Sequence, residues 1–105
     1  MNETQASIGQ WREDTFGPII GHALDGRVAD EMKEMGEALI AHLSDAAPDY
    51  TVMEEMADVL ITMFAWAEHH GLDLLEHVDK KMAINRARKW RRHGDGTGQH
   101  IKEGE

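Results

Sequence analysis

The sequence contains no cysteine, only two prolines and few aromatic residues. Without cysteine the chain can form neither a disulfide framework nor a thiolate metal site, and it has no thiol nucleophile. Its longest apolar stretches are about a dozen residues, well below the roughly 20 that span a bilayer. The amino terminus also lacks the basic and apolar regions of a secretory signal. We therefore expect a cytoplasmic protein with no membrane partner.

Positive charge is also scarce, since 11 lysines and arginines stand against 20 acidic residues and give a formal net charge of -9. Proteins that bind nucleic-acid polymers need a basic footprint for the phosphates, so the composition excludes this class of partner. Seven of the 11 basic residues lie between Lys80 and Arg92. The 105 residues of the chain suffice for one small domain.

Helical periodicity dominates what the sequence does contain. Apolar residues recur at spacings of three and four in one segment, as in an amphipathic helix, namely at Val28, Met32, Met35, Leu39 and Leu43. No strand pattern competes, and the glycine-rich residues 93–105 are predicted to form a mobile tail. The sequence thus predicts an all-α, four-helix bundle with helices over residues 3–14, 25–43, 51–70 and 73–91.

In the segment EEMADVLITMFAWA, every residue from Met56 to Ala67 is apolar except Thr62 and one carboxylate, Asp58, which stands where a helix is expected to be buried. A buried acid must be neutral, paired with a basic side chain, or bound to a cation. A carboxylate-bridged iron pair needs Glu-x-x-His on its helices, and no glutamate here has a histidine three residues on. Two options remain, a buried pair with Arg or Lys and an all-oxygen cluster of two acidic pairs. Such a cluster would suit Mg²⁺, and its pairs would be Glu34 with Glu37 and Glu55 with Asp58.

The fourth predicted helix carries a polar stripe beside its apolar face. The stripe consists of Lys81, Asn85, Arg88 and Arg92, spaced so that they share one side of a helix. An exposed charged face or a partner for the buried acid would explain it. The more specific interpretation is a clamp for the phosphates of a nucleotide, beside bound Mg²⁺.

Taken in order, the blocks EMGEAL, EEMADVL and KMAINRARKW resemble the MazG-like all-alpha nucleoside triphosphate pyrophosphohydrolases. The resemblance covers about residues 25–92, which it implies are the core of the domain. The resemblance implies hydrolysis between the alpha and beta phosphates, which yields a nucleoside monophosphate and pyrophosphate. It implies Mg²⁺ as cofactor, with Mn²⁺ as a substitute, and a homo-oligomer, either dimer or tetramer. The implied catalytic metal ligands are Glu34, Glu37, Glu55 and Asp58, and the implied substrate-binding residues are Lys81, Asn85 and Arg88.

Two further segments, QWREDTFGP and GTGQHI, are similar to the dATP/dGTP branch of this family, which is often found in phage genomes. The branch implies a purine deoxynucleotide substrate. Trp11 and Phe16 could stack a purine, although core packing would also explain them. His100 is a candidate substrate contact on the resemblance alone. The competing hypothesis is a non-catalytic helical module that binds nucleotide or protein.

Overall fold

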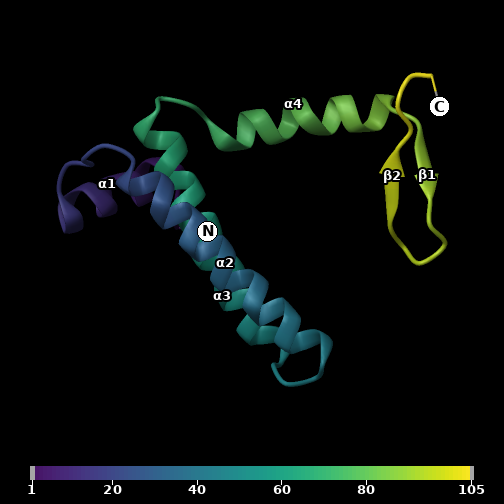
Figure 1. The fold of residues 1–105 in the computed structure, drawn as a ribbon. Coiled ribbons are helices and arrows are strands. Elements are labelled where there is room, and N and C mark those ends of the chain that lie inside the picture. The colour runs from purple at the N-terminus through teal and green to yellow at the C-terminus, as the bar shows by residue number, and fades with distance from the viewer. Residues whose placement is uncertain (1, 105) are drawn as a thin grey trace. The chain divides into compact units, whose positions relative to one another are not determined.

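The structure is a computed structural model that describes residues 2–104. Its elements in chain order are α1 (Gln5–Phe16), α2 (Ala23–Leu43), α3 (Asp49–His69), α4 (Leu74–Ala87), β1 (Trp90–Arg92) and β2 (Gly98–His100) (Figure 1). Within residues 2–104 four helices are therefore present as predicted, and the all-α class is confirmed apart from one small hairpin. Over the described residues, none of the helices is both long enough and apolar enough to cross a membrane. The chain divides into two compact units, residues 1–74 and 75–105.

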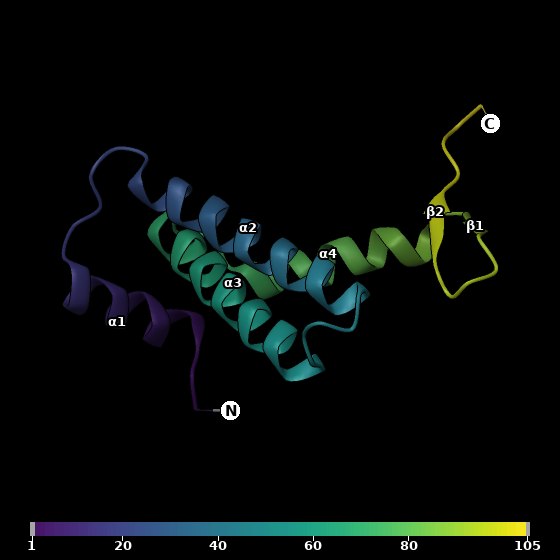
Figure 2. The same ribbon diagram turned by 60° about the horizontal axis from the view of Figure 1, so that its bottom comes forward.

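The first unit is built on α2 and α3, which run antiparallel and lie side by side (Figures 1 and 2). α1 packs against α3. The centre of this contact is apolar, because Ile8 of α1 joins Phe64 and Ala65 of α3 in the buried core and Leu74 packs against them. The Gln5 amide of α1 also donates to the Glu68 carboxylate of α3 at 3.1 Å. Removal of these side chains from water is the main force that holds α1 in place.

Local chemistry sets both ends of α1. The Thr4 hydroxyl accepts a hydrogen bond from the Ser7 N–H at 3.0 Å, and the Ser7 hydroxyl accepts one from the Thr4 N–H at 2.7 Å. This reciprocal cap fixes the first turn. Gly17 ends the helix with a φ of 78°, which glycine adopts without steric cost, and Pro18 follows. The helix is thus shifted by two residues from the predicted span.

The covered side of α2 differs from the predicted apolar stripe. Met32 and Leu39 belong to that stripe, yet they are 52% and 36% exposed. The spacing of apolar residues could not select the covered face, because apolar residues lie on more than one side of this helix. Two residues of the stripe, Val28 and Met35, are half-buried as predicted. The other buried and half-buried positions include Leu24, Glu31 and Ala38. The covered side of α2 therefore contains a carboxylate.

A polar contact joins the start of α2 to the end of α3. The Trp66 indole N–H donates to one carboxylate oxygen of Asp25 at 2.6 Å, and His22 Nδ1 lies 2.6 Å from the other. The Trp66 ring also packs on the ring of His70, with centroids 4.1 Å apart. The hydrogen bonds from Trp66 and His22, in that order of importance, lower the pKa of Asp25.

Replacing Trp66 with Phe is expected to lower stability at neutral pH and to have less effect in acid. A carboxyl group with a lowered folded pKa contributes stability above its unfolded pKa of about 3.9, and this contribution disappears as the pH falls through the folded pKa. Denaturant unfolding at about pH 6 and about pH 2.5 measures the difference between wild type and variant. Trp90→Phe is the control, because its indole donates to the uncharged carbonyl of Asn85 at 2.7 Å. If the loss of stability in Trp66→Phe is as independent of pH as the loss in Trp90→Phe, the Trp66 indole does not lower the pKa of Asp25.

The second unit contains most of α4 and an antiparallel hairpin of β1 and β2 (Figure 1). The strands pair Trp90 with His100 and Arg92 with Gly98. The prediction of a tail without strands is wrong for this segment. Each strand is only three residues long and β1 is exposed throughout, so no alternation of apolar and polar residues could signal it.

The turn of the hairpin is made by short-range polar contacts. The Asp95 carboxylate accepts hydrogen bonds from the Thr97 N–H at 2.9 Å and from the Thr97 hydroxyl at 2.6 Å. Gly94 and Gly96 flank Asp95 with φ angles of 88° and 92°, a region that favours glycine. Turn chemistry rather than hydrophobic pattern therefore specifies this part of the chain.

Candidate metal and active site

Three glutamates bring their carboxylates together in the first unit. Glu31 and Glu34 of α2 and Glu55 of α3 each offer one oxygen, and these oxygens lie within 4.8 Å of one another. Glu31 and Glu34 are three residues apart, so they are neighbours on one helix surface. Three carboxylates at this separation repel one another when ionised. The group, called the carboxylate cluster below, therefore favours a bound cation.

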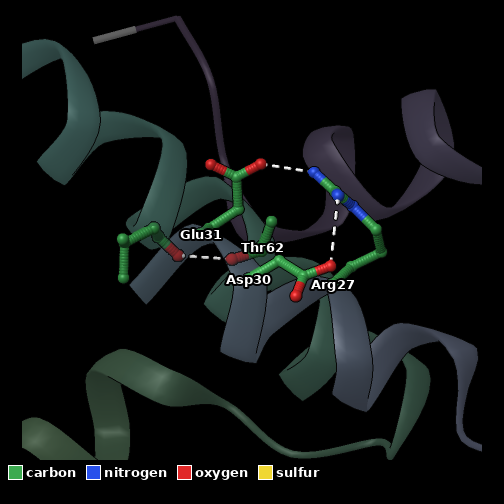
Figure 3. A network of polar contacts seen from close by, with 5 residues as sticks. Arg27, Asp30, Glu31 and Thr62 are labelled. Atoms are coloured by element: carbon green, nitrogen blue, oxygen red, sulfur yellow. Dashed lines mark hydrogen bonds and ion pairs between the residues drawn. The ribbon is translucent and has the colours of Figure 1, made fainter. Parts of the chain in front are cut away.

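Glu31 is the most buried member of the carboxylate cluster, with a side chain 10% exposed. Burial raises the pKa of its carboxyl group, and the nearby Glu34 carboxylate adds to the rise. Its Oε1 pairs with the Arg27 guanidinium one helical turn earlier (Figure 3). Its Oε2 and the Oε2 of Glu55 are buried without a hydrogen-bond partner.

Unpartnered buried carboxylate oxygens are costly, because nothing replaces the water they have lost. Two such oxygens in one cluster are suitable ligands for a cation. The donor set is entirely carboxylate oxygen, which is the chemistry that Mg²⁺ and Mn²⁺ prefer. The residues present therefore fit a hard divalent ion.

Of the four acids predicted as ligands, the structure brings together only Glu34 and Glu55 in the cluster found among its described residues. Glu37 and Asp58 are exposed. The predicted burial of Asp58 is therefore wrong. The apolar residues around it on α3 include Met56 and Leu60, which are themselves exposed in the single chain, so an apolar sequence context did not mean burial. The Asp58 charge still contributes to the raised pKa of Glu31.

The predicted phosphate-binding stripe falls in the second unit. Lys81 is exposed on α4, and Asn85, four residues later, is half-buried on the same helix surface. Arg88 is half-buried and lies just beyond the end of the helix. The stripe does not extend to Arg92 as predicted, because α4 ends at Ala87 and Arg92 belongs to β1.

The candidate aromatic and histidine contacts have distinct surroundings. Trp11 and Phe16 are 55% and 70% exposed and meet edge to face, with ring centroids 5.6 Å apart. Core packing therefore does not explain either ring in this chain. His100 is half-buried in β2, and its ring centroid lies 5.9 Å from that of Trp90.

Comparison with known proteins gives relatives over nearly the whole chain, although no family model matches it. A dATP/dGTP diphosphohydrolase of Cyanophage S-2L is 45% identical over 99 residues, which are 94% of this chain and 86% of the relative. A dATP/dGTP diphosphohydrolase of Salmonella phage PMBT28 is 36% identical over 103 residues. These residues are 97% of this chain, which spans only 32% of the length of that relative.

A solved structure shares the fold as well as the sequence. It is the Cyanophage S-2L MazG-like pyrophosphohydrolase bound to dGDP and three catalytic Mn²⁺ ions per active site. The TM-score is 0.63 and the identity 34%, over 94% of this chain and 89% of that one.

The fold of the chain is that of a MazG-like pyrophosphohydrolase. The resemblance noted in the sequence is thereby confirmed. With the extensive match to the cyanophage relative, the chain belongs to the dATP/dGTP diphosphohydrolase family of this class.

Proposed function

We propose that this protein hydrolyses dATP and dGTP to the deoxynucleoside monophosphate and pyrophosphate in the presence of Mg²⁺, with Mn²⁺ as a substitute. The carboxylate cluster carries the proposal, because two of its buried oxygens lack a partner. The reaction and the substrate class are proposed from the family relationship.

The proposed metal ligands are the carboxylate cluster together with Glu37 and Asp58. Each of these two exposed acids lies three residues beyond a cluster member, so each can extend the ligand set along its own helix. Bound divalent ions would supply an activated water and would stabilise the leaving pyrophosphate oxygen. The chain's own part is to hold the carboxylates fixed in position before substrate arrives.

The proposed phosphate contacts are Lys81, Asn85 and Arg88, which offer two cations and an amide donor. Cationic donors bind phosphate oxygens through charge-assisted hydrogen bonds and offset their charge. Trp11 and Phe16 present exposed ring surface on which a purine could stack, and His100 is proposed as a further substrate contact.

We also propose that the protein is a homo-oligomer. Large apolar side chains are exposed on both long helices of the first unit, and exposed apolar surface of this extent is typical of interfaces. A second copy is the proposed partner, because such residues occur on α2 and α3 alike. They are Met32, Leu39, Ile40 and Leu43 on α2, and Met53, Met56, Leu60, Ile61 and Met63 on α3.

The test is a panel of the eight common ribo- and deoxyribonucleoside triphosphates with Mg²⁺, with monophosphate and pyrophosphate both quantified. We expect dATP and dGTP to be the preferred substrates and pyrophosphate to appear in equal amount with monophosphate. Light scattering of the same preparation should give the mass of a dimer or a tetramer of the 11.8 kDa chain. Orthophosphate as the sole product would refute the reaction type. No turnover of any nucleotide would favour the non-catalytic binding module.

A further inference from the structure

Arg27 contacts the carboxylate cluster from its own helix, one turn before Glu31 (Figure 3). Its Nη2 donates to Oε1 of Glu31, and its Nη1 lies 3.6 Å from Oδ2 of Asp30. The guanidinium side chain is 57% exposed, whereas the Glu31 side chain is 10% exposed. Arg27 therefore reaches from solvent to one oxygen of a buried carboxylate.

The two oxygens of Glu31 consequently differ. Oε1 is occupied by Arg27, and Oε2 is buried without a partner (Figure 3). The Thr62 hydroxyl of α3, drawn in the same view, donates to the Val59 carbonyl at 2.8 Å (Figure 3). The other cluster members are carboxylates and act as acceptors when ionised.

We propose that Arg27 is a positioning residue for the metal centre. By holding Oε1, it fixes the rotation of the Glu31 carboxylate and presents Oε2 to the divalent ion as a single-oxygen ligand. Metal-binding carboxylates commonly depend on such outer hydrogen bonds, and their loss costs about 10–100-fold in metal affinity. This inference rests on the proposed function in one respect, namely that a divalent ion binds the carboxylate cluster.

The test is Mn²⁺ binding to metal-free protein, measured by calorimetry and by electron paramagnetic resonance in the absence of nucleotide. Arg27→Met should bind Mn²⁺ about 10–100-fold more weakly than wild type. Arg27→Lys should bind with intermediate affinity, because an ammonium group can reach residue i+4 but cannot form the planar guanidinium contact. Asp30→Asn is the matched control. It removes the exposed second partner of Arg27 and should leave Mn²⁺ affinity within about threefold of wild type.

Wild-type Mn²⁺ affinity in Arg27→Met would overturn the proposal, because Arg27 would then have no effect on the metal ligand. Tighter binding would also overturn it, because Arg27 would then compete with the ion for Glu31. Circular dichroism without metal checks that the variants fold. If Arg27→Met does not fold, Arg27→Lys decides, because weaker binding than wild type supports positioning and equal or tighter binding refutes it. A wild-type protein that binds Mn²⁺ but hydrolyses no nucleotide would refute the proposed function and leave the role of Arg27 in place.

Discussion

Glu31→Gln is expected to remove most nucleotide hydrolysis and to lower kcat/KM by more than the about 10–100-fold typical of residues that only support metal ligands. The substitution keeps the size of the side chain but removes the charge from the most buried member of the carboxylate cluster. Oε2 of Glu31 is one of the two oxygens of the carboxylate cluster that are buried without a hydrogen-bond partner. The substitution therefore changes an oxygen that is available to bind the ion. Glu55→Gln should have a comparable effect for the same reason.

Without metal, Glu31→Gln should not lose stability, although it loses activity. Ionised Glu31 lies within 4.8 Å of two other carboxylates, and burial opposes its ionisation. Removing its charge should therefore leave the metal-free protein at least as stable as wild type. Wild type should gain about 2.7 kcal/mol when Mn²⁺ is present at 100 times its Kd, and Glu31→Gln should lose most of this gain. Thermal unfolding with and without Mn²⁺ measures both quantities.

Two matched substitutions make this result interpretable. Glu13→Gln removes the same charge from an exposed position on α1 and should leave hydrolysis and the Mn²⁺ effect near wild type. Glu37→Gln removes a proposed ligand that lies outside the carboxylate cluster and should cost less than Glu31→Gln. A larger loss for Glu37→Gln would restore the sequence prediction and contradict the ranking drawn from the structure.

The comparison of Glu31 with Glu37 also explains what the sequence could reveal about the site. Glu34 forms a Glu-x-x-Glu pair with either residue, and the sequence resemblance selected the pair with Glu37. The sequence does contain a signal that Glu31 is buried. Glu31 lies three residues after Val28 and four before Met35, so it shares their side of the helix, and this side of α2 is covered. The criterion that points to Asp58, an acid among apolar residues, therefore applies to Glu31 as well.

The helices could be predicted because they follow from local pattern and from helix ends such as Gly17, whereas burial could not. α3 packs against both α1 and α2, as its apolar character predicts, yet Leu60 and Met63 on it are 46% and 37% exposed in the single chain. Sequence hydrophobicity reports the surface that must be covered, but it does not distinguish coverage by the same chain from coverage by another copy. The hairpin was missed because its turn depends on contacts of Asp95 and Thr97.

Phe64→Ala is expected to lower the free energy of unfolding by about 3–5 kcal/mol, the usual cost of removing a buried aromatic ring. Phe64 is 5% exposed and lies in the core with Ile8 and Ala65. Domains of this size are stable by only about 5–15 kcal/mol, so this loss is a large fraction of the total. Denaturant unfolding followed by far-UV circular dichroism measures it. Phe64→Leu keeps most of the apolar volume and should lose clearly less.

The same substitution tests how α1 contributes to activity. Because the core contact of Phe64 with Ile8 holds α1 against α3, its loss should loosen the helix that carries Trp11 and Phe16. If these rings contact the purine, Phe64→Ala should raise KM for dGTP, measured where the variant is still folded, while Mn²⁺ affinity stays near that of wild type. An unchanged KM together with a lowered free energy of unfolding would show that α1 supports only the fold. Reduced Mn²⁺ affinity would instead indicate that the core contact also positions the carboxylate cluster.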